Sequence, residues 1–272
     1  MEEVNLKKEE KNELGSSTGH MILLDEFVTL KMSEEFMEMF FVVIQLGAIL
    51  AVVWLYWKKL FPFSFKREFH VKISILQMWF KIIFACLPAA IVGLLFDDQL
   101  NAWFYNYQTV SIMLILFGIL FIIIENSNHG KRPQITKLSQ ITYKTAFLIG
   151  LFQLIAAVFP GTSRSGATII GGLLIGMSRT VAAEFTFFLA VPVMFGASVL
   201  KLIKFGLAFE SDEIAVLLVG VITSFVVSVI AIKFLMGYIK RNDFKPFGWY
   251  RIVLGILVLG YFGIQTIFGT PA

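Results

Sequence analysis

The chain has 272 residues, of which 57% are hydrophobic and 15% are charged, and phenylalanine alone fills 29 positions. A mean hydropathy of +0.79 excludes an ordinary water-soluble domain, which would aggregate with this composition, and predicts an integral membrane protein. The formal net charge is +4, but nucleic-acid binding is the weaker explanation for it, because the basic residues are scattered over loops. The single cysteine, Cys86, cannot form an intrachain disulfide.

Residues 1–15 form a charged segment with no apolar run, so we expect them neither to enter the membrane nor to act as a signal peptide. After them, six hydrophobic stretches reach the roughly 20 residues that a membrane-spanning helix needs. They lie at approximately 38–57, 73–96, 107–125, 184–203, 214–237 and 250–268. The sequence thus predicts an all-α integral membrane protein with about six transmembrane helices, in a single polytopic domain over residues 1–272.

A seventh apolar segment, over residues 145–178, is interrupted in its middle by Pro160, Gly161 and Arg164. This pattern predicts two half-length helices that meet at a turn, in a re-entrant hairpin that enters and leaves the membrane on one side. Irregular backbone is tolerated at membrane depth only where it lines protein or a water-filled cavity. The turn is therefore expected inside the bundle.

The loops between these segments alternate in charge. Loops 58–72, 126–144 and 238–248 together hold twelve lysines and arginines, whereas loops 97–106 and 205–213 hold none. Basic loops stay on the cytoplasmic side of a membrane. The pattern predicts that both chain termini lie outside and that the mouth of the re-entrant hairpin lies inside.

The interruption itself reads Pro-Gly-Thr-Ser-Arg-Ser-Gly-Ala-Thr over residues 160–168. A cation at membrane depth costs several kcal/mol unless it meets water, protein or a ligand, so Arg164 needs an anionic partner. Short side chains and a guanidinium group together suit phosphate oxygens. The residues expected to bind them are Gly161, Thr162, Ser163, Ser165, Gly166 and Thr168. The alternative is a structural turn whose hydroxyls cap a helix, with Arg164 reaching toward the membrane surface.

A faint internal repeat links this motif to the start of the chain. The segment Ser16–His20 parallels Thr162–Gly166, and the phenylalanine pairs and Gly-Ala pairs that follow each copy keep an offset of 146 to 149 residues. Three spans follow each motif, so the second copy is upside down relative to the first. We therefore predict two inverted repeats, at 16–125 and 145–268, whose motifs face each other across one pocket.

The chain resembles the undecaprenyl-diphosphate phosphatases, also called bacitracin-resistance proteins. The resemblance rests on the motifs at 16–20, 42–50, 160–168, 182–185 and 247–251. It implies hydrolysis of a C55 polyprenyl diphosphate lipid to the monophosphate and phosphate, which recycles the lipid carrier for peptidoglycan synthesis and confers bacitracin resistance. It further implies a multi-pass protein of the bacterial plasma membrane, with membrane lipid and a second copy of the chain as expected partners and an active site toward the outer face.

Residue chemistry and the resemblance together identify Ser17, His20 and Arg164 as the candidate catalytic residues. Ser17 and His20 are three residues apart, so on a helical turn they would share one face and supply a nucleophile and a proton carrier. Arg164 would stabilise the charge on the transferred phosphoryl group. Alone, Ser17 is more typical of a capping hydroxyl and His20 of an interfacial histidine, and the sequence leaves open which of them attacks. Supporting roles fall to Ser16 and Thr18 in substrate binding, and to Gln45 and Gln153 as polar residues inside the bundle.

The first fifteen residues depart from the family pattern. The resemblance implies a divalent cation, Mg²⁺ or Ca²⁺, held by two glutamates four residues apart, but those positions are Lys7 and Lys11 here. Glu9, Glu10 and Glu13 are weak substitutes, although their carboxylates are the hard ligands that such ions prefer. We expect a foreign or altered segment, and two alternatives follow: a catalytically impaired family member, or a polyprenyl-phosphate transporter, since inverted repeats are also typical of transporters.

Overall fold

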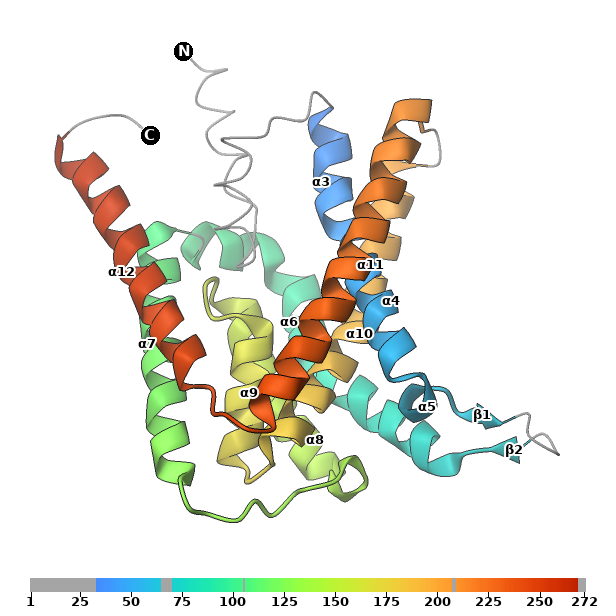
Figure 1. Cartoon of the computed structure of the whole chain (residues 1–272). Helices are drawn as coiled ribbons and strands as arrows, with labels where there is room; N and C mark the ends of the chain where they lie inside the picture. Colours follow the sequence, from blue (N-terminus) through green and yellow to red (C-terminus); the bar gives the residue numbers. More distant parts are fainter. Residues whose placement is uncertain (1–32, 65–69, 105, 207–208, 269–272) are drawn as a thin grey trace.

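The computed structural model of the chain describes residues 33–64, 70–104, 106–206 and 209–268, and this part is helical apart from one two-stranded hairpin (Figure 1). The first half contains α3 (Glu34–Val43), α4 (Gln45–Leu55), α5 (Trp57–Leu60), β1 (Phe63–Ser64), β2 (His70–Val71), α6 (Ile73–Phe104) and α7 (Tyr107–Asn128). The second half contains a short 3₁₀ turn (Leu138–Gln140), α8 (Tyr143–Val158), α9 (Arg164–Leu174), α10 (Arg179–Phe205), α11 (Ser211–Ile239) and α12 (Lys245–Phe268). The strands are antiparallel, with Phe63 opposite Val71.

Six helical segments are long and apolar enough to cross a membrane, which confirms the predicted spans. They are Glu35–Leu55, Ile73–Phe96, Tyr107–Asn128, Arg179–Phe205, Ser211–Ile239 and Lys245–Gly263. Several boundaries differ from the prediction by a few residues, and the structure explains two of them. Helix α10 begins at residue 179 because the Ser178 side chain accepts a hydrogen bond from the amide of Val181 and so caps the helix. Helix α6 continues to Phe104, so most of the predicted loop after residue 96 is helical.

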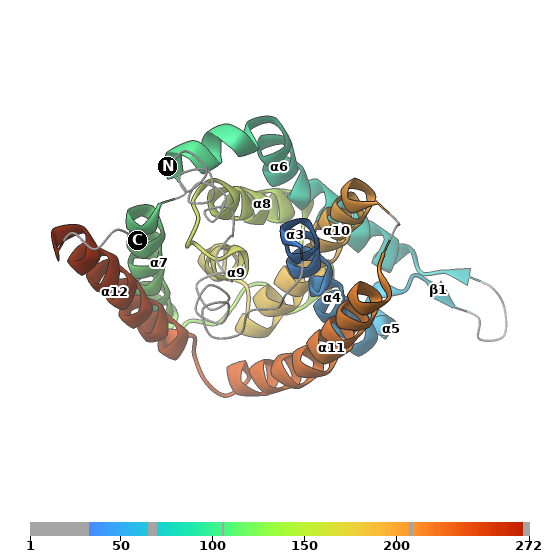
Figure 2. The ribbon, with the colours of Figure 1, turned by 90° about the horizontal axis from the view of Figure 1, so that it is seen from above.

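Helices α8 and α9 form the re-entrant hairpin that the interrupted segment predicts. With 16 and 11 residues, they are about 24 and 16 Å long at 1.5 Å per residue, too short to cross a hydrocarbon core of about 30 Å. Helix α8 packs against α6 and α9, and α9 contacts α7 and α10 as well. Figure 2 shows both helices enclosed by the longer ones, which places the polar turn inside protein.

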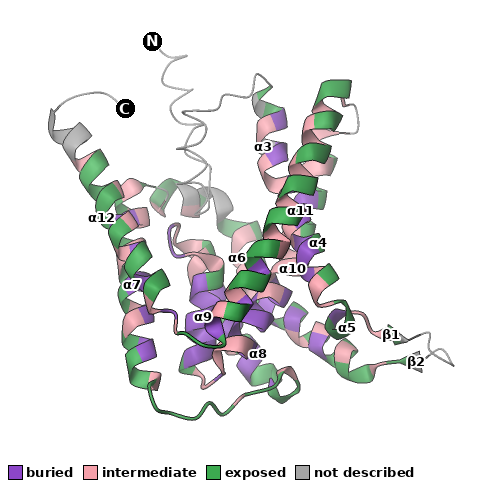
Figure 3. Cartoon of the chain, viewed as in Figure 1, coloured by how far each residue is buried: buried purple, intermediate pink, exposed green. Residues whose placement is uncertain are grey.

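Burial follows the same plan. Helix α9 is buried from Gly166 to Leu173, and the largest buried side chains include Phe185, Phe188 and Ile149 around it. In contrast, the membrane-spanning window of α11 has none of its residues buried, and Figure 3 shows exposed residues along α11 and α12. The hairpin is therefore the packed centre, and the outer helices present apolar side chains to lipid.

The connections between helices lie at two ends of the molecule. The β1–β2 hairpin and the loop between α7 and α8 lie at one end, and the α6–α7 and α10–α11 connections lie at the other (Figure 1). The loop between α11 and α12 belongs with the basic loops by its charge. At the other end, Lys204 lies in the last turn of α10, where a cation is favourable next to the C-terminal carbonyl groups. The assignment of the two ends to cytoplasm and exterior stays a prediction.

The first predicted repeat is only partly within the described residues. Its hydroxyl-rich segment, Ser16–His20, lies outside them, as does the charged segment 1–15. The inverted repeat over 16–125 and 145–268 therefore stays a prediction.

Candidate functional site

The turn between α8 and α9 has a backbone that its sequence requires. Gly161 has φ of +86°, and a Cβ atom there would lie 2.5 Å from the carbonyl oxygen of Val110 on α7, so only glycine fits. Ser163 has φ of +64° and is the one non-glycine residue in the left-handed region within the described part of the chain. A left-handed conformation at a non-glycine residue costs energy and is found mainly at functional sites. The strained turn is therefore a candidate functional site.

Hydroxyl groups organise the start of α9. The Ser163 side chain accepts a hydrogen bond from the amide of Gly166 (3.3 Å) and lies 3.3 Å from the hydroxyl of Ser165. Ser165 is exposed. The predicted binding residue Thr168 is buried instead, and its hydroxyl contacts the Arg164 carbonyl oxygen (3.0 Å) and the Thr186 hydroxyl of α10 (2.9 Å). Thr168 thus joins α9 to α10, while Ser163 and Ser165 face the turn.

Arg164 is the first residue of α9 and is half-buried. The two buried carboxylates of the described residues, Glu125 and Glu184, are paired with Arg179 and Lys59. In that part of the chain no carboxylate pairs with Arg164. Its charge adds to the positive end of a helix whose first amide groups lack intrahelical partners. A guanidinium group and amide N–H groups converge in this way where proteins bind phosphate.

The carbonyl oxygens of the turn are held by Arg251, a residue that sequence reasoning did not single out. Arg251 lies on α12 and is buried, and its Nη2 donates hydrogen bonds to the carbonyl oxygens of Gly161 (2.8 Å) and Thr162 (2.6 Å). Gly118 of α7 and Gly248 of α12 let these two helices pack closely enough for Arg251 to contact the turn. A Cβ atom on either glycine would lie 2.7 Å from the carbonyl oxygen of the other. The only signal in the sequence was the place of Arg251 in the motif at 247–251.

The two glutamines behave differently from each other. Gln153 of α8 is buried, and its Oε1 has no hydrogen-bond partner among the described residues. Thr162 is also buried, with its hydroxyl likewise unpartnered within the described chain. Gln45 donates to the carbonyl oxygen of Phe41 (3.2 Å), one turn earlier along the chain. Gln45, the first residue of α4, therefore bonds to the end of the preceding helix α3, and Gln153 is the glutamine that belongs to the hairpin.

Two ion pairs, also missed from the sequence, fix the end of the molecule that carries the basic loops. Arg179 Nε donates to both carboxylate oxygens of Glu125 (3.0 and 3.1 Å), and the amide of Phe244 donates to the same group (3.0 Å). Lys59 Nζ lies 2.7 Å from both oxygens of Glu184. The first pair ties α7 to α10 and to the α11–α12 connection. The second ties α5 to α10.

The described residues at the turn do not fit a divalent cation. Around it they supply hydroxyls and two arginines, and the described part of the chain contains no cluster of three His, Cys, Asp or Glu side chains suited to a metal. Proteins usually hold Mg²⁺ and Ca²⁺ with at least one carboxylate, and the described residues of the turn supply none. The acidic candidates Glu9, Glu10 and Glu13, the lysines 7 and 11, and the predicted residues Ser16, Ser17, Thr18 and His20 all lie outside the described residues.

Fold and site together define a class: a polytopic α-helical membrane protein whose candidate site lies on the turn of a re-entrant hairpin. Comparison with known proteins makes the class specific. The model of the family of bacitracin resistance protein BacA matches residues 16–257. The chain belongs to this family. The match begins at Ser16, directly after the charged segment.

Close relatives carry one name. The undecaprenyl-diphosphatase of Desulfitobacterium hafniense is 71% identical over 254 residues, which cover 93% of this chain and 91% of the relative. Undecaprenyl-diphosphatase 1 of Clostridium acetobutylicum is 68% identical over 247 residues, covering 91% and 90%. The undecaprenyl-diphosphatase of Acetivibrio thermocellus is 60% identical over the same length, with the same coverage of 91% and 90%.

Proposed function

We propose that this chain is an enzyme that hydrolyses undecaprenyl diphosphate to undecaprenyl phosphate and inorganic phosphate, and so recycles the lipid carrier for peptidoglycan synthesis. One observation carries the proposal: Arg164 opens α9 at membrane depth with no carboxylate partner in the described chain. An unpaired cation in that place requires an anionic ligand. The relatives at 60–71% identity are undecaprenyl-diphosphatases, and bacitracin resistance follows from membership of the family.

The chemistry assigns distinct tasks to the residues of the turn. Arg164 and the amides of the first α9 turn neutralise the charge that develops on the terminal phosphoryl group. Arg251 holds the turn that presents them. Ser17 or His20 attacks the terminal phosphorus, the bond to the bridging oxygen breaks, and undecaprenyl phosphate leaves. Water then releases inorganic phosphate from the enzyme. The choice between Ser17 and His20 stays open.

The outer face of the plasma membrane is the proposed side of the active site. Both ends of the hairpin connect to loops of the basic end, through residues 129–142 and through the turn at 175–178. The Gly161–Ser163 turn is therefore the tip that points away from that end. If the basic loops are cytoplasmic, the tip opens toward the exterior.

The competing functions receive no support from the relatives. All three named above are diphosphatases rather than transporters. Dependence on Mg²⁺ or Ca²⁺ and assembly into a homodimer stay predictions.

A sealed-vesicle experiment separates hydrolysis from transport. The full chain is reconstituted in proteoliposomes with undecaprenyl diphosphate in the outer leaflet only, and phosphate is measured in the external buffer. A diphosphatase releases phosphate on a time course that follows protein concentration, with and without added Mg²⁺ as separate arms. A transporter instead moves intact labelled lipid to the inner leaflet without phosphate release, and that result would replace the proposal.

A further inference from the structure

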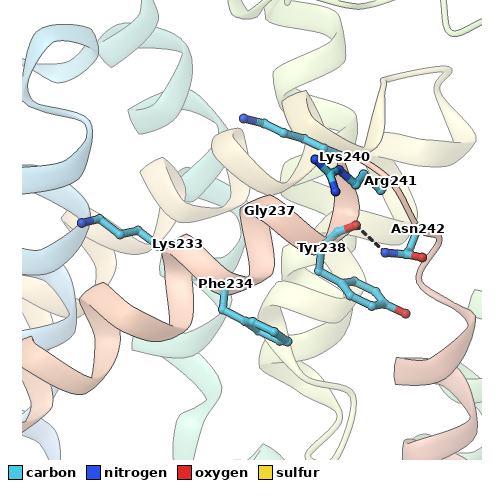
Figure 4. A pocket seen from close by; sticks show the side chains of 7 residues that line it. All are labelled: Lys233, Phe234, Gly237, Tyr238, Lys240, Arg241 and Asn242. Carbon is cyan, nitrogen blue, oxygen red and sulfur yellow. Dashed lines mark hydrogen bonds between the residues drawn. The ribbon is translucent and has the colours of Figure 1, made fainter.

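The end of α11 carries a hollow that the hairpin site does not use. It has a volume of about 480 Å³ and lies at the basic-loop end of the helix. We call it the α11 hollow, and its lining residues are Lys233, Phe234, Gly237, Tyr238, Lys240, Arg241 and Asn242 (Figure 4). All of them belong to the last turns of α11 and the first residues after it.

The end of α11 places three basic residues at the hollow. Lys233 and Gly237 are four residues apart on one face of α11, and Lys240 and Arg241 follow directly after its last residue, Ile239. All four line the hollow. A Cβ atom on Gly237 would meet nothing within 4 Å. The glycine is thus the open floor of the hollow. Figure 4 shows Lys240 and Arg241 extending side by side from the helix.

The charge of the hollow is uncompensated. Its lining contains three cations and no carboxylate. Three cations elsewhere in the described chain do have carboxylate partners: Lys59 with Glu184, Arg179 with Glu125, and Lys245 with Asp243. Within the same described residues, Lys240 and Arg241 have no carboxylate within salt-bridge distance, and Lys233 lies over the ring of Trp54 (5.7 Å). An anion is therefore the complementary ligand.

The negative end of the helix dipole does not cancel this charge. A helix C-terminus carries about half a negative charge on its last carbonyl groups. Here the carbonyl oxygen of Tyr238 accepts hydrogen bonds from the amides of Arg241 (3.1 Å) and Asn242 (2.9 Å) and from the Asn242 side chain (3.1 Å). The three cations outweigh the remaining partial charge.

The depth of the hollow matches lipid headgroups. Helix α11 has 29 residues and is about 44 Å long, which exceeds a hydrocarbon core of about 30 Å. Its last turns therefore reach the interface. The rings of Phe234 and Tyr238 lie stacked with centroids 6.3 Å apart, and Phe234 is 71% exposed. Aromatic rings beside lysines are typical of the level where acyl chains meet headgroups.

We propose that the α11 hollow binds the phosphodiester headgroup of an anionic phospholipid, in the leaflet that faces the basic loops. Lys240 and Arg241 contact the phosphate oxygens, and Lys233 contributes charge from about two helical turns deeper. The rings of Phe234 and Tyr238 lie against the glycerol and the start of the acyl chains. A lipid suits this place better than a soluble anion does, because the hollow lies at the end of α11, whose membrane-spanning window has none of its residues buried within the protein.

Spin-labelled lipids test the proposal directly. The full chain is placed in phosphatidylcholine nanodiscs with a trace of spin-labelled phosphatidylglycerol or spin-labelled phosphatidylcholine, and the immobilised fraction of each label is measured. We expect phosphatidylglycerol to be favoured. The double variant K240Q/R241Q should lower this preference by about fivefold or more, since each cation near a membrane surface attracts an anionic lipid appreciably.

Two further variants make the test specific. K131Q/R132Q removes two exposed cations from another basic loop and should leave the preference unchanged. Gly237→Leu fills the floor without changing charge, keeps a good helix former, and should lower the preference by itself. Equal losses in both double variants, or an unchanged preference in Gly237→Leu, would mean a diffuse surface charge and would overturn the site. Displacement of the labelled lipid by millimolar inorganic phosphate would overturn the assignment to lipid.

Discussion

Arg251→Met should separate positioning of the Gly161–Ser163 turn, the proposed phosphate site, from general stability. Methionine keeps most of the length of the aliphatic part of the arginine side chain. It removes the guanidinium group and both of its hydrogen bonds to the carbonyl oxygens of Gly161 and Thr162. Hydrogen bonds from a charged donor contribute about 1.5–3 kcal/mol each. Because the variant also removes a buried charge that costs free energy to desolvate, we take the low end for both bonds. The expected loss is about 3 kcal/mol, or roughly a hundredfold in kcat/KM if it all falls on the transition state.

The assay is phosphate release from undecaprenyl diphosphate by purified protein, with kcat and KM determined separately and Tm measured in the same detergent. We expect kcat to fall more than KM rises. A displaced turn should weaken binding of the phosphoryl group in the transition state more than binding of the substrate in the ground state. Arg251→Lys should recover about a tenth of the wild-type rate, because an ammonium group does not reproduce the planar fork.

Arg179→Met is the matched control. It also removes a bonded arginine, but one that pairs with Glu125 at the basic-loop end. It should lower Tm and leave kcat/KM of the folded protein within about threefold, because exposed or remote pairs act on stability rather than on chemistry. A folded Arg251→Met protein with near-wild-type kcat/KM would refute the positioning role. An equal loss in both variants would do the same.

Three other predictions concern the turn, the topology and the first residues. Gly161→Ala should lower activity at least tenfold, because a left-handed φ and a close contact with the Val110 carbonyl oxygen both oppose a Cβ; wild-type kinetics would show that the turn tolerates it. A reporter fused after Arg132 should indicate cytoplasm and one after Asp212 the exterior, and the same side for both would reverse the charge argument. Replacing residues 1–15 by an apolar helix with Glu at the positions of Lys7 and Lys11 should raise Mg²⁺-dependent hydrolysis. Equal rates and equal metal dependence in the two proteins would mean that the charged segment does not impair activity.

Much of the fold was predictable because the local amino-acid composition identifies membrane-spanning helices. A run of about 20 apolar residues has few alternatives to a spanning helix, and the six spans follow. The hairpin was equally accessible, since Pro160, Gly161 and Arg164 interrupt an apolar segment too short for two crossings. The end of α6 was misplaced because hydropathy marks where a membrane span ends, whereas the helix itself continues to Phe104.

The contacts of the site were less predictable, because they join residues far apart in the chain. Arg251 reaches the turn from a position 90 residues away, and Lys59 pairs with Glu184 across 125 residues. Contacts between residues so far apart in the chain leave no pattern in the local sequence. The role of Thr168 differed for another reason: a threonine hydroxyl inside a helix bonds readily to the carbonyl oxygen three or four residues earlier. Its place in a hydroxyl-rich motif does not reveal that choice.

The central claim is that Arg164 at the tip of the hairpin carries phosphoryl transfer, and the rate of phosphate release from undecaprenyl diphosphate by Arg164→Ala tests it most directly. Loss of this charge should lower kcat/KM by about 3–4 kcal/mol, or several hundredfold, and Arg164→Lys should recover little. Arg241→Ala, which removes an exposed arginine of the α11 hollow, controls for net charge and should hydrolyse the substrate at the wild-type rate. Near-normal turnover by folded Arg164→Ala protein would contradict the account.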